Sequence, residues 1–194
     1  MQAHYHYILY KPFEMLSQLG TEGYKRKRGL AELYNFPEGV YPIGRLDEDS
    51  EGLLMMTSDN KLSVEIRSES VEKEYWVQLD GDITNEAIDK LQAGLHLVIK
   101  KEAIITKPCK AWKITEEPHF EERFPPTRAG KHRPYSWLAI VLKEGKFRQV
   151  RKMTAAVGYP TLRLIRVRIG NIKLDEMKPG EVKQIDDLKT ACLV

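Results

Sequence analysis

The densest group of residues able to do chemistry is an acidic stretch, Asp47-Glu48-Asp49-Ser50-Glu51-Gly52. Acids at its first, third and fifth positions and a glycine at its sixth are typical of a calcium-binding loop. The twelfth position of such a loop holds a bidentate glutamate, but here it is Ser58, and the residues that follow Gly52 are apolar. The stretch is therefore a poor calcium site. Two interpretations stay open, an ionised carboxylate acting as nucleophile or base and an ordinary surface turn.

The sequence shows little sign of a metal site, a nucleotide-binding loop or a catalytic serine. The five histidines include one close pair, His4 and His6, which is too few for a zinc site, and neither Cys109 nor Cys192 lies in a CxxC motif. The chain also lacks a glycine-rich phosphate loop and a nucleophile elbow. We therefore expect no metal and no nucleotide cofactor.

The composition indicates a globular protein. The 194 residues are 42% hydrophobic and 30% charged, which suits a chain with a sizeable core. No apolar run approaches the roughly 18 residues of a transmembrane helix, and the first residues lack the pattern of a secretory signal. With two cysteines outside any disulfide pattern, we expect a cytoplasmic protein with reduced thiols.

The charge of the chain is unevenly distributed. Residues 123–168 hold twelve Lys and Arg and one acid, Glu144, a net of +11 that leaves −8 for the rest of a chain whose net charge is +3. Such asymmetry favours a polyanionic partner bound on one side of the molecule, although a solvated basic surface is the plainer interpretation. A second basic run, Lys25-Arg26-Lys27-Arg28, is interpreted as a solvated loop next to the nucleic-acid surface.

The elements that carry these charges are predicted from periodicity. A helix is expected over 147–157, ended by Gly158 and Pro160, with basic residues on one face and apolar residues on the opposite face. Its basic face holds Arg148, Arg151 and Lys152, and its apolar face holds Val150, Met153 and Val157. The strand expected over 162–169 should likewise expose Arg166 and Arg168 and bury Ile165, Val167 and Ile169.

The remaining elements are interspersed along the chain. Strands are predicted over 5–10, 53–56, 75–79, 103–115 and 136–142, and helices over 29–34, from Ser58 or Asp59 to Arg67, and after Thr84. The stretch 117–135 is rich in Pro, Arg and His and is expected to be a loop. Since helices do not alternate regularly with strands, we predict an α+β fold with a mixed or antiparallel sheet.

Several stretches resemble the motifs of RNA pseudouridine synthases, and most closely those of the branch that acts on ribosomal RNA. Gly44-Arg45-Leu46-Asp47, followed by 49–59, is similar to the family's catalytic motif. Lys73-Glu74-Tyr75-Trp76-Val77 is similar to its Lys-x-Tyr motif, and residues 144–153 to its third motif. The opening residues 7–17, around Lys11-Pro12, match as well. Three motifs in the family's order over most of the chain form a specific signal.

This resemblance implies an enzyme that isomerises a uridine of ribosomal RNA to pseudouridine without a cofactor. Asp47 matches the catalytic aspartate, and Tyr75 matches the tyrosine that stacks on the uracil and is proposed to take its C5 proton. Arg151 matches the basic residue that pairs with the aspartate and keeps it ionised. The residues expected to contact RNA are all basic, namely Arg45, Arg148, Lys152, Arg163, Arg166 and Arg168.

The resemblance also implies the organisation of the chain. We expect the pseudouridine synthase fold, in which helices and loops flank a central mixed, mostly antiparallel sheet. One catalytic domain should span residues 4–190, without the separate N-terminal RNA-binding domain of the S4 kind found in many relatives. The expected partner of this monomer is 23S ribosomal RNA. The alternative is a non-catalytic RNA-binding protein that keeps the fold, against which Asp47, Tyr75 and Arg151 argue together.

Overall fold

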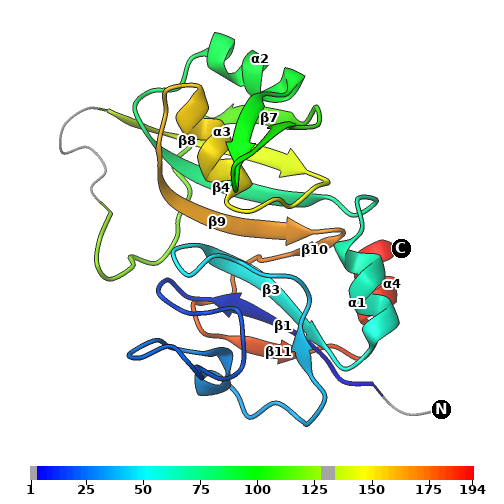
Figure 1. Ribbon diagram of the computed structural model, residues 1–194. Helices are drawn as coiled ribbons and strands as arrows, with labels where there is room; N and C mark the ends of the chain where they lie inside the picture. The colour runs from blue at the N-terminus through cyan, green and yellow to red at the C-terminus, as the bar shows by residue number, and fades with distance from the viewer. Residues whose placement is uncertain (1–3, 128–133) are drawn as a thin grey trace. The chain divides into compact units, whose positions relative to one another are not determined.

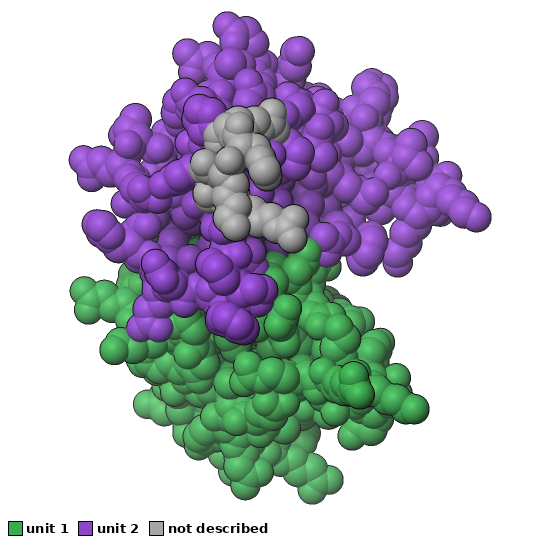
Figure 2. All heavy atoms as spheres, turned by 90° about the vertical axis from the view of Figure 1, so that its left-hand side faces the viewer, with its two compact units in different colours: residues 1–73, 165–194 green, residues 74–164 purple. Residues whose placement is uncertain are grey.

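The computed structural model describes residues 4–127 and 134–194, which divide into two compact units. Unit 1 comprises the chain up to Lys73 together with Ile165–Val194, and unit 2 comprises Glu74–Leu164. Figure 2 shows the residues of each. The polypeptide thus leaves unit 1 after Lys73 and returns to it within one strand. The expectation of one catalytic domain over 4–190 stays a prediction, and the sequence patterns did not indicate this division.

Unit 1 is built around a sheet in the order β11-β1-β3-β9 (Figure 1). Its elements are β1 (His6–Lys11), η1 (Leu30–Glu32), β2 (Tyr41–Pro42), β3 (Glu51–Thr57), α1 (Asn60–Arg67), the unit's part of β9 (Thr161–Ile169), β10 (Ile172–Lys173), β11 (Val182–Gln184) and α4 (Leu188–Leu193). Strand β1 pairs antiparallel with β3 and with β11, whereas β3 pairs parallel with β9. Two short strands also pair antiparallel, β2 with β3 and β10 with β9.

The apolar run of the sequence becomes the central strand β3, in which every residue is buried. A strand covered on both faces has a continuous apolar sequence rather than an alternating one. The cluster around it consists of Tyr7, Leu9, Met15, Leu30, Val40, Leu54 and Met56.

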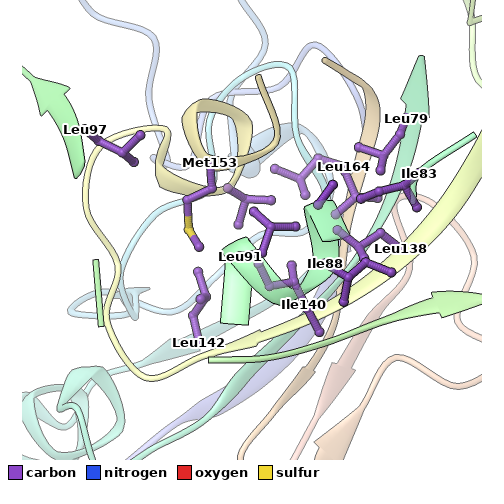
Figure 3. Packing of buried hydrophobic residues seen from close by; sticks show 14 of the residues in the cluster. Leu79, Ile83, Ile88, Leu91, Leu97, Leu138, Ile140, Leu142, Met153 and Leu164 are labelled. Atoms are coloured by element: carbon purple, nitrogen blue, oxygen red, sulfur yellow. The ribbon is translucent and has the colours of Figure 1, made fainter. Parts of the chain in front are cut away.

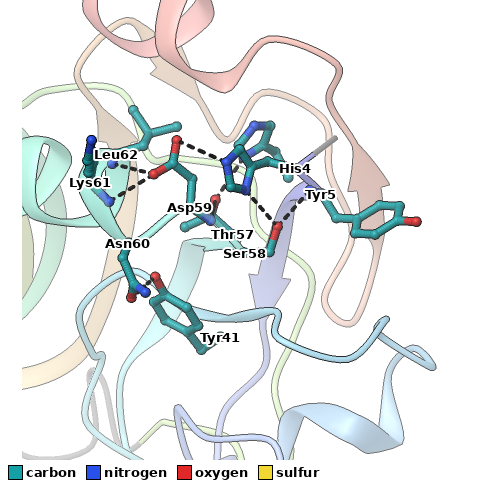
Figure 4. Close-up of polar contacts among 10 residues, drawn as sticks. His4, Tyr5, Tyr41, Thr57, Ser58, Asp59, Asn60, Lys61 and Leu62 are labelled. Carbon is teal, nitrogen blue, oxygen red and sulfur yellow. Dashed lines mark hydrogen bonds and ion pairs between the residues drawn. The ribbon is translucent and has the colours of Figure 1, made fainter. Parts of the chain in front are cut away.

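Helix α1 begins directly after β3, because Asp59 caps it (Figure 4). The Asp59 carboxylate accepts hydrogen bonds from the backbone N–H groups of Lys61 and Leu62, at 2.8 and 3.1 Å. These bonds satisfy donors that the first turn of a helix leaves without partners. Of the two caps that the sequence allowed, Asp59 is therefore the one used, while the Ser58 hydroxyl accepts the backbone N–H of Tyr5 at 2.9 Å.

Unit 2 packs two helices against a sheet in the order β4-β8-β7. Its elements are β4 (Lys73–Asp80, from Glu74 on), α2 (Asn85–Ala93), β5 (His96–Ile99), β6 (Glu102–Ile105), β7 (Lys110–Ile114), β8 (Tyr135–Leu142), α3 (Gln149–Ala156) and the beginning of β9. Strands β5 and β6 form a separate two-stranded sheet. Figure 3 shows Leu91 of α2, Met153 of α3 and Ile140 of β8 in the shared core of this unit.

These elements confirm an α+β fold with a mixed, mostly antiparallel sheet, in which the β3–β9 pair is parallel. Two predicted strands need correction. The strand expected over 103–115 is two strands, β6 and β7, separated by residues 106–109, and β5 was not predicted. In β9, residues 163–166 are buried without alternation, so the expected exposed arginine face was wrong there. A period-2 pattern indicates exposure only when one face of the strand is open to solvent.

Candidate active site

Asp47 is half-buried and lies in the loop between β2 and β3. The loop closes as a turn in which the backbone N–H of Ser50 donates to the Asp47 carbonyl at 3.0 Å. Ser50 and Glu51 are buried, so only the first acids of the stretch reach the protein surface. The acidic stretch is therefore a short turn anchored to the central strand of unit 1. This placement suits a carboxylate held in a fixed position.

Ser17 fixes the backbone immediately before Asp47. Its hydroxyl donates to the carbonyl of Leu46 at 2.8 Å and accepts the N–H of the same residue at 2.9 Å. Both residues are buried, which protects these bonds from water. Sequence reasoning included Ser17 in the opening stretch 7–17, but no local signal showed that it would bond to residue 46.

Lys11 supports the loop from the inside of unit 1. Its side chain is fully buried at the end of β1, and its Nζ donates to the carbonyls of Pro12, Met15 and Glu48, at 2.8, 2.7 and 3.4 Å. Burial lowers the pKa of Lys11 to about 7, while nearby carboxylates, Glu51 foremost, act in the opposite direction. The Glu48 side chain forms an ion pair with the exposed Lys27 at 2.6 Å. Lys11 and Lys27 therefore both hold the residue next to Asp47.

Gly52 is required where the loop enters β3. Its φ is +105°, and a Cβ added there would lie 2.4 Å from the carbonyl oxygen of Arg166 and 2.7 Å from its backbone nitrogen. The Arg166 side chain also donates from Nε to the Leu53 carbonyl at 2.8 Å. The backbones of β3 and β9 thus approach each other at the glycine. Only a residue without a side chain fits this position.

Gly52→Ala should therefore destabilise the protein by more than about 3 kcal/mol, because backbone strain and a collision with main-chain atoms add. Gly39→Ala is the matched control in the same unit. Gly39 has a φ of +83° but nothing within 4 Å of an added Cβ, so only strain of about 1–3 kcal/mol is expected. Urea denaturation of both variants measures the difference. Equal losses would show that the close approach at Gly52 carries no cost.

Three arginines that were expected to contact RNA have partners within the protein. Arg166 is 5% exposed and Arg163 is 7% exposed, and Arg163 donates from Nη2 to the Glu121 carbonyl at 3.0 Å. Arg168 is half-buried and forms an ion pair with Glu72 at 3.1 Å. Within the protein the guanidinium groups of these three arginines are thus already bonded, and their phosphate contacts stay a prediction. Arg45, by contrast, is exposed two residues before Asp47.

Tyr75 lies in β4 of unit 2, where it is half-buried and packs against the core cluster of that unit. Lys73, two residues earlier and the last residue of the first segment of unit 1, donates from Nζ to the Ser68 carbonyl at 2.9 Å. Burial, and then the charge of Arg166, lower the pKa of Lys73 to about 8. The Lys-x-Tyr motif thus lies at the point where the chain passes from one unit to the other.

Helix α3 presents the faces that its sequence predicts. Val150 and Met153 are buried in the core, Val157 is half-buried, and Arg151 and Lys152 are half-buried on the basic side. Lys152 Nζ donates to the carbonyl of Val98 in β5 at 3.2 Å. The amphipathic prediction is therefore confirmed for the core face.

The turn that leads into α3 is fixed by two buried polar side chains. The Glu144 carboxylate accepts from Gln149 Nε2 at 2.6 Å and from the N–H of Lys107 at 2.9 Å. Gln149 Oε1 in turn accepts the N–H of Lys146 at 3.0 Å. Arg148 follows in a left-handed conformation, with a φ of 51°, as the residue before the helix. Sequence reasoning counted Glu144 as the one acid of the basic segment and as the first residue of the third motif, but no local signal indicated its bond to residue 107.

The predicted catalytic residues thus come from both units, Asp47 from unit 1 and Tyr75 and Arg151 from unit 2. Their meeting around one uridine stays a prediction. Among the residues that the structure describes, no three His, Cys, Asp or Glu side chains are grouped as metal ligands would be. None of the described helices is long and apolar enough to cross a membrane.

Comparison with known proteins supports the family resemblance that the motifs indicated. A family model described as RNA pseudouridylate synthase matches residues 4–156. The ribosomal large subunit pseudouridine synthase E of Vibrio parahaemolyticus serotype O3:K6 is 43% identical over 181 residues, which cover 92% of this chain and 72% of that protein. The protein of the same name from Xanthomonas axonopodis pv. citri is 42% identical and 89% of each chain is covered.

A solved structure shows the same fold. The crystal structure of a pseudouridylate synthase has a TM-score of 0.79 with this chain, at 24% identity, and the match covers 100% of this chain and 75% of that one. The fold and the branch of the family that the sequence motifs predicted are both confirmed.

Proposed function

The chain belongs to the RNA pseudouridylate synthase family, and on this premise we propose that it isomerises a specific uridine of 23S ribosomal RNA to pseudouridine. Relatives that are 40–43% identical over most of the chain carry the name of a large-subunit ribosomal RNA enzyme. The observation that carries the proposal is the Asp47 turn, whose backbone accepts hydrogen bonds from the buried residues Ser17 and Lys11. A turn so fixed suits catalysis, which requires a reacting group in a defined position.

The reaction rearranges one nucleotide without net oxidation or reduction. The bond from uracil N1 to ribose C1′ breaks, the base turns, and a new bond forms between C5 and C1′. The proton lost from C5 is balanced by a proton gained at N1. In our proposal Asp47 acts at the sugar, either by attacking C1′ or as the base of a glycal route. Tyr75 stacks on the uracil and accepts the C5 proton.

Arg151 is proposed to pair with Asp47 and keep it ionised in the closed site. The target uridine must leave its stack to reach this carboxylate, which costs a few kcal/mol. Contacts between basic side chains and the RNA backbone offset that cost and position the nucleotide rather than read its sequence. Arg45, Arg148 and Lys152 are the basic residues that we propose for these contacts.

The proposal is tested by incubating the purified protein with unmodified 23S ribosomal RNA transcribed in vitro. Pseudouridine is then mapped by its carbodiimide adduct, which stops reverse transcription. We expect one new stop and no requirement for an added cofactor. RNA binding without any new stop would favour the non-catalytic alternative. Size-exclusion chromatography with light scattering tests the proposed monomer.

Removing two positive charges from the basic face of α3 should weaken the binding of every RNA sequence tested. With Arg148→Gln and Lys152→Gln combined, the loss of two phosphate contacts should reduce the slope of log affinity against log salt by about 1.8. The fold should persist, since the core face of α3 is carried by Val150 and Met153. Filter binding over a range of KCl concentrations measures the slope. An unchanged slope would place the RNA contacts elsewhere.

A further inference from the structure

The turn between β5 and β6 has an unusual sequence for its geometry. Ile99 pairs with Glu102, so Lys100 and Lys101 are the two central residues of the hairpin turn. Both have positive φ values, 51° and 71°. A two-residue turn with positive φ at both positions strongly favours Asn-Gly, because other side chains are strained there. Two adjacent lysines are therefore not explained by the local fold.

Side-chain contacts connect this turn with the N-terminal end of α3, in the same unit. Lys100 Nζ lies 5.4 Å from the centroid of the Phe147 ring, one residue before Arg148. Lys152 of α3 donates to the carbonyl of Val98 in β5. The hairpin turn thus lies next to the beginning of α3, and we call Lys100, Lys101 and Phe147 the hairpin-tip site. Both lysines are exposed.

Phe147 supplies the second feature of the site. It is a large aromatic residue that keeps 51% of its surface exposed beside a cation. The exposed ring of an aromatic residue next to lysines is the combination that binds single-stranded nucleic acid, in which cations track the phosphates and rings stack on bases. In the surrounding segments, 98–102 and 143–152, seven Lys and Arg accompany two acids, of which Glu144 is buried.

We propose that the hairpin-tip site is a further RNA-contact site, in which Lys100 and Lys101 bind backbone phosphates and Phe147 stacks on an unpaired base. This inference rests on the proposed function, and it joins Phe147 of the third motif to two lysines that lie outside the family motifs. Strained backbone is often kept where a residue acts on a ligand. The strain at Lys100 and Lys101 is accounted for if their charges serve binding, since fold stability alone would favour Asn-Gly.

The test uses a change that should affect stability and binding in opposite directions. Lys100→Asn with Lys101→Gly installs the preferred turn and removes both charges. We expect a melting temperature equal to or above that of the unchanged protein. The salt slope for in vitro transcribed 23S ribosomal RNA should fall by about 1.4, the value for two phosphate contacts on a single strand, with weaker binding at low salt. Phe147→Leu should leave the slope unchanged and weaken binding about fivefold or more, the loss of one stacked base.

Lys90→Gln with Lys113→Gln is the control, because both lysines are exposed in the same unit, on α2 and β7. Its salt slope should stay unchanged. If the hairpin change left the salt slope unaffected, or if the control lowered it equally, Lys100 and Lys101 would not contact phosphates. Normal RNA binding by Phe147→Leu would show that Phe147 does not stack on a base. Pseudouridine formation by the unchanged protein is measured alongside. Its absence would contradict the proposed function, whereas the binding results judge the hairpin-tip site alone.

Discussion

Asp47→Asn is expected to lower pseudouridine formation by about 10⁴-fold or more while leaving RNA affinity within a few-fold. The substitution removes the carboxylate that we propose to react at the ribose but nearly preserves its shape. The backbone of the turn should stay in place, because Ser17 and Lys11 hold it through main-chain groups. Release of tritium from C5-labelled ribosomal RNA measures turnover, and filter binding measures affinity.

Glu48→Gln is the matched control for that change. Glu48 neighbours Asp47 in the same turn, and its side chain pairs with an exposed lysine. The contact of Lys11 is made to the Glu48 carbonyl, which the substitution keeps. This variant should turn over within a few-fold of the unchanged protein. Equal losses in both variants would mean that the turn as a whole, rather than the Asp47 carboxylate, was disturbed.

Tyr75→Phe should slow pseudouridine formation at least about a hundredfold, with nearly normal RNA binding and melting temperature. The substitution keeps a ring that can stack on the uracil and removes the hydroxyl proposed to accept the C5 proton, a role usually worth about 10²–10⁴ in rate. Tyr75→Leu should lose the reaction and also affinity, since stacking is worth about 1–3 kcal/mol per base. Single-turnover kinetics with excess protein measures both variants.

Tyr159→Phe controls for the loss of a hydroxyl from unit 2. Tyr159 is half-buried and packs against the same core cluster as Tyr75. Removing its hydroxyl should lower the stability by no more than about 1 kcal/mol and leave the activity unchanged. If Tyr75→Phe retained a near-normal rate, the hydroxyl would not be the proton acceptor, and only the stacking role would remain for Tyr75.

Sequence patterns predicted the helices that neighbouring residues determine. Val150, Met153 and Val157, spaced three and four residues apart, match the 3.6-residue period of α3. The capping acid Asp59 defines the beginning of α1. The assignment of Asp47 depended on the resemblance, because composition alone favoured an ordinary acidic surface turn. Composition and spacing describe what a site contains, and they leave open what the site does.

The features missed from the sequence depend on contacts between distant residues. Arg166 follows the alternation of an exposed face, but the sheet of unit 1 buries it against the carbonyl of Leu53. Lys11 ends an apolar strand, and its bond to Glu48 spans 37 residues. The Glu144–Lys107 bond likewise joins two separate segments of unit 2. The sequence pattern around either residue of such a hydrogen bond does not indicate the other residue.

The central claim, that Asp47 modifies one uridine of 23S ribosomal RNA, is tested most directly by mapping pseudouridine in cells that lack this protein. The same cells are examined after they receive either the unchanged protein or Asp47→Asn. We predict that one pseudouridine disappears, returns with the unchanged protein and stays absent with the variant, although both are made in equal amounts. Restoration of that pseudouridine by Asp47→Asn, or an unaltered 23S map in cells lacking the protein, would contradict this account.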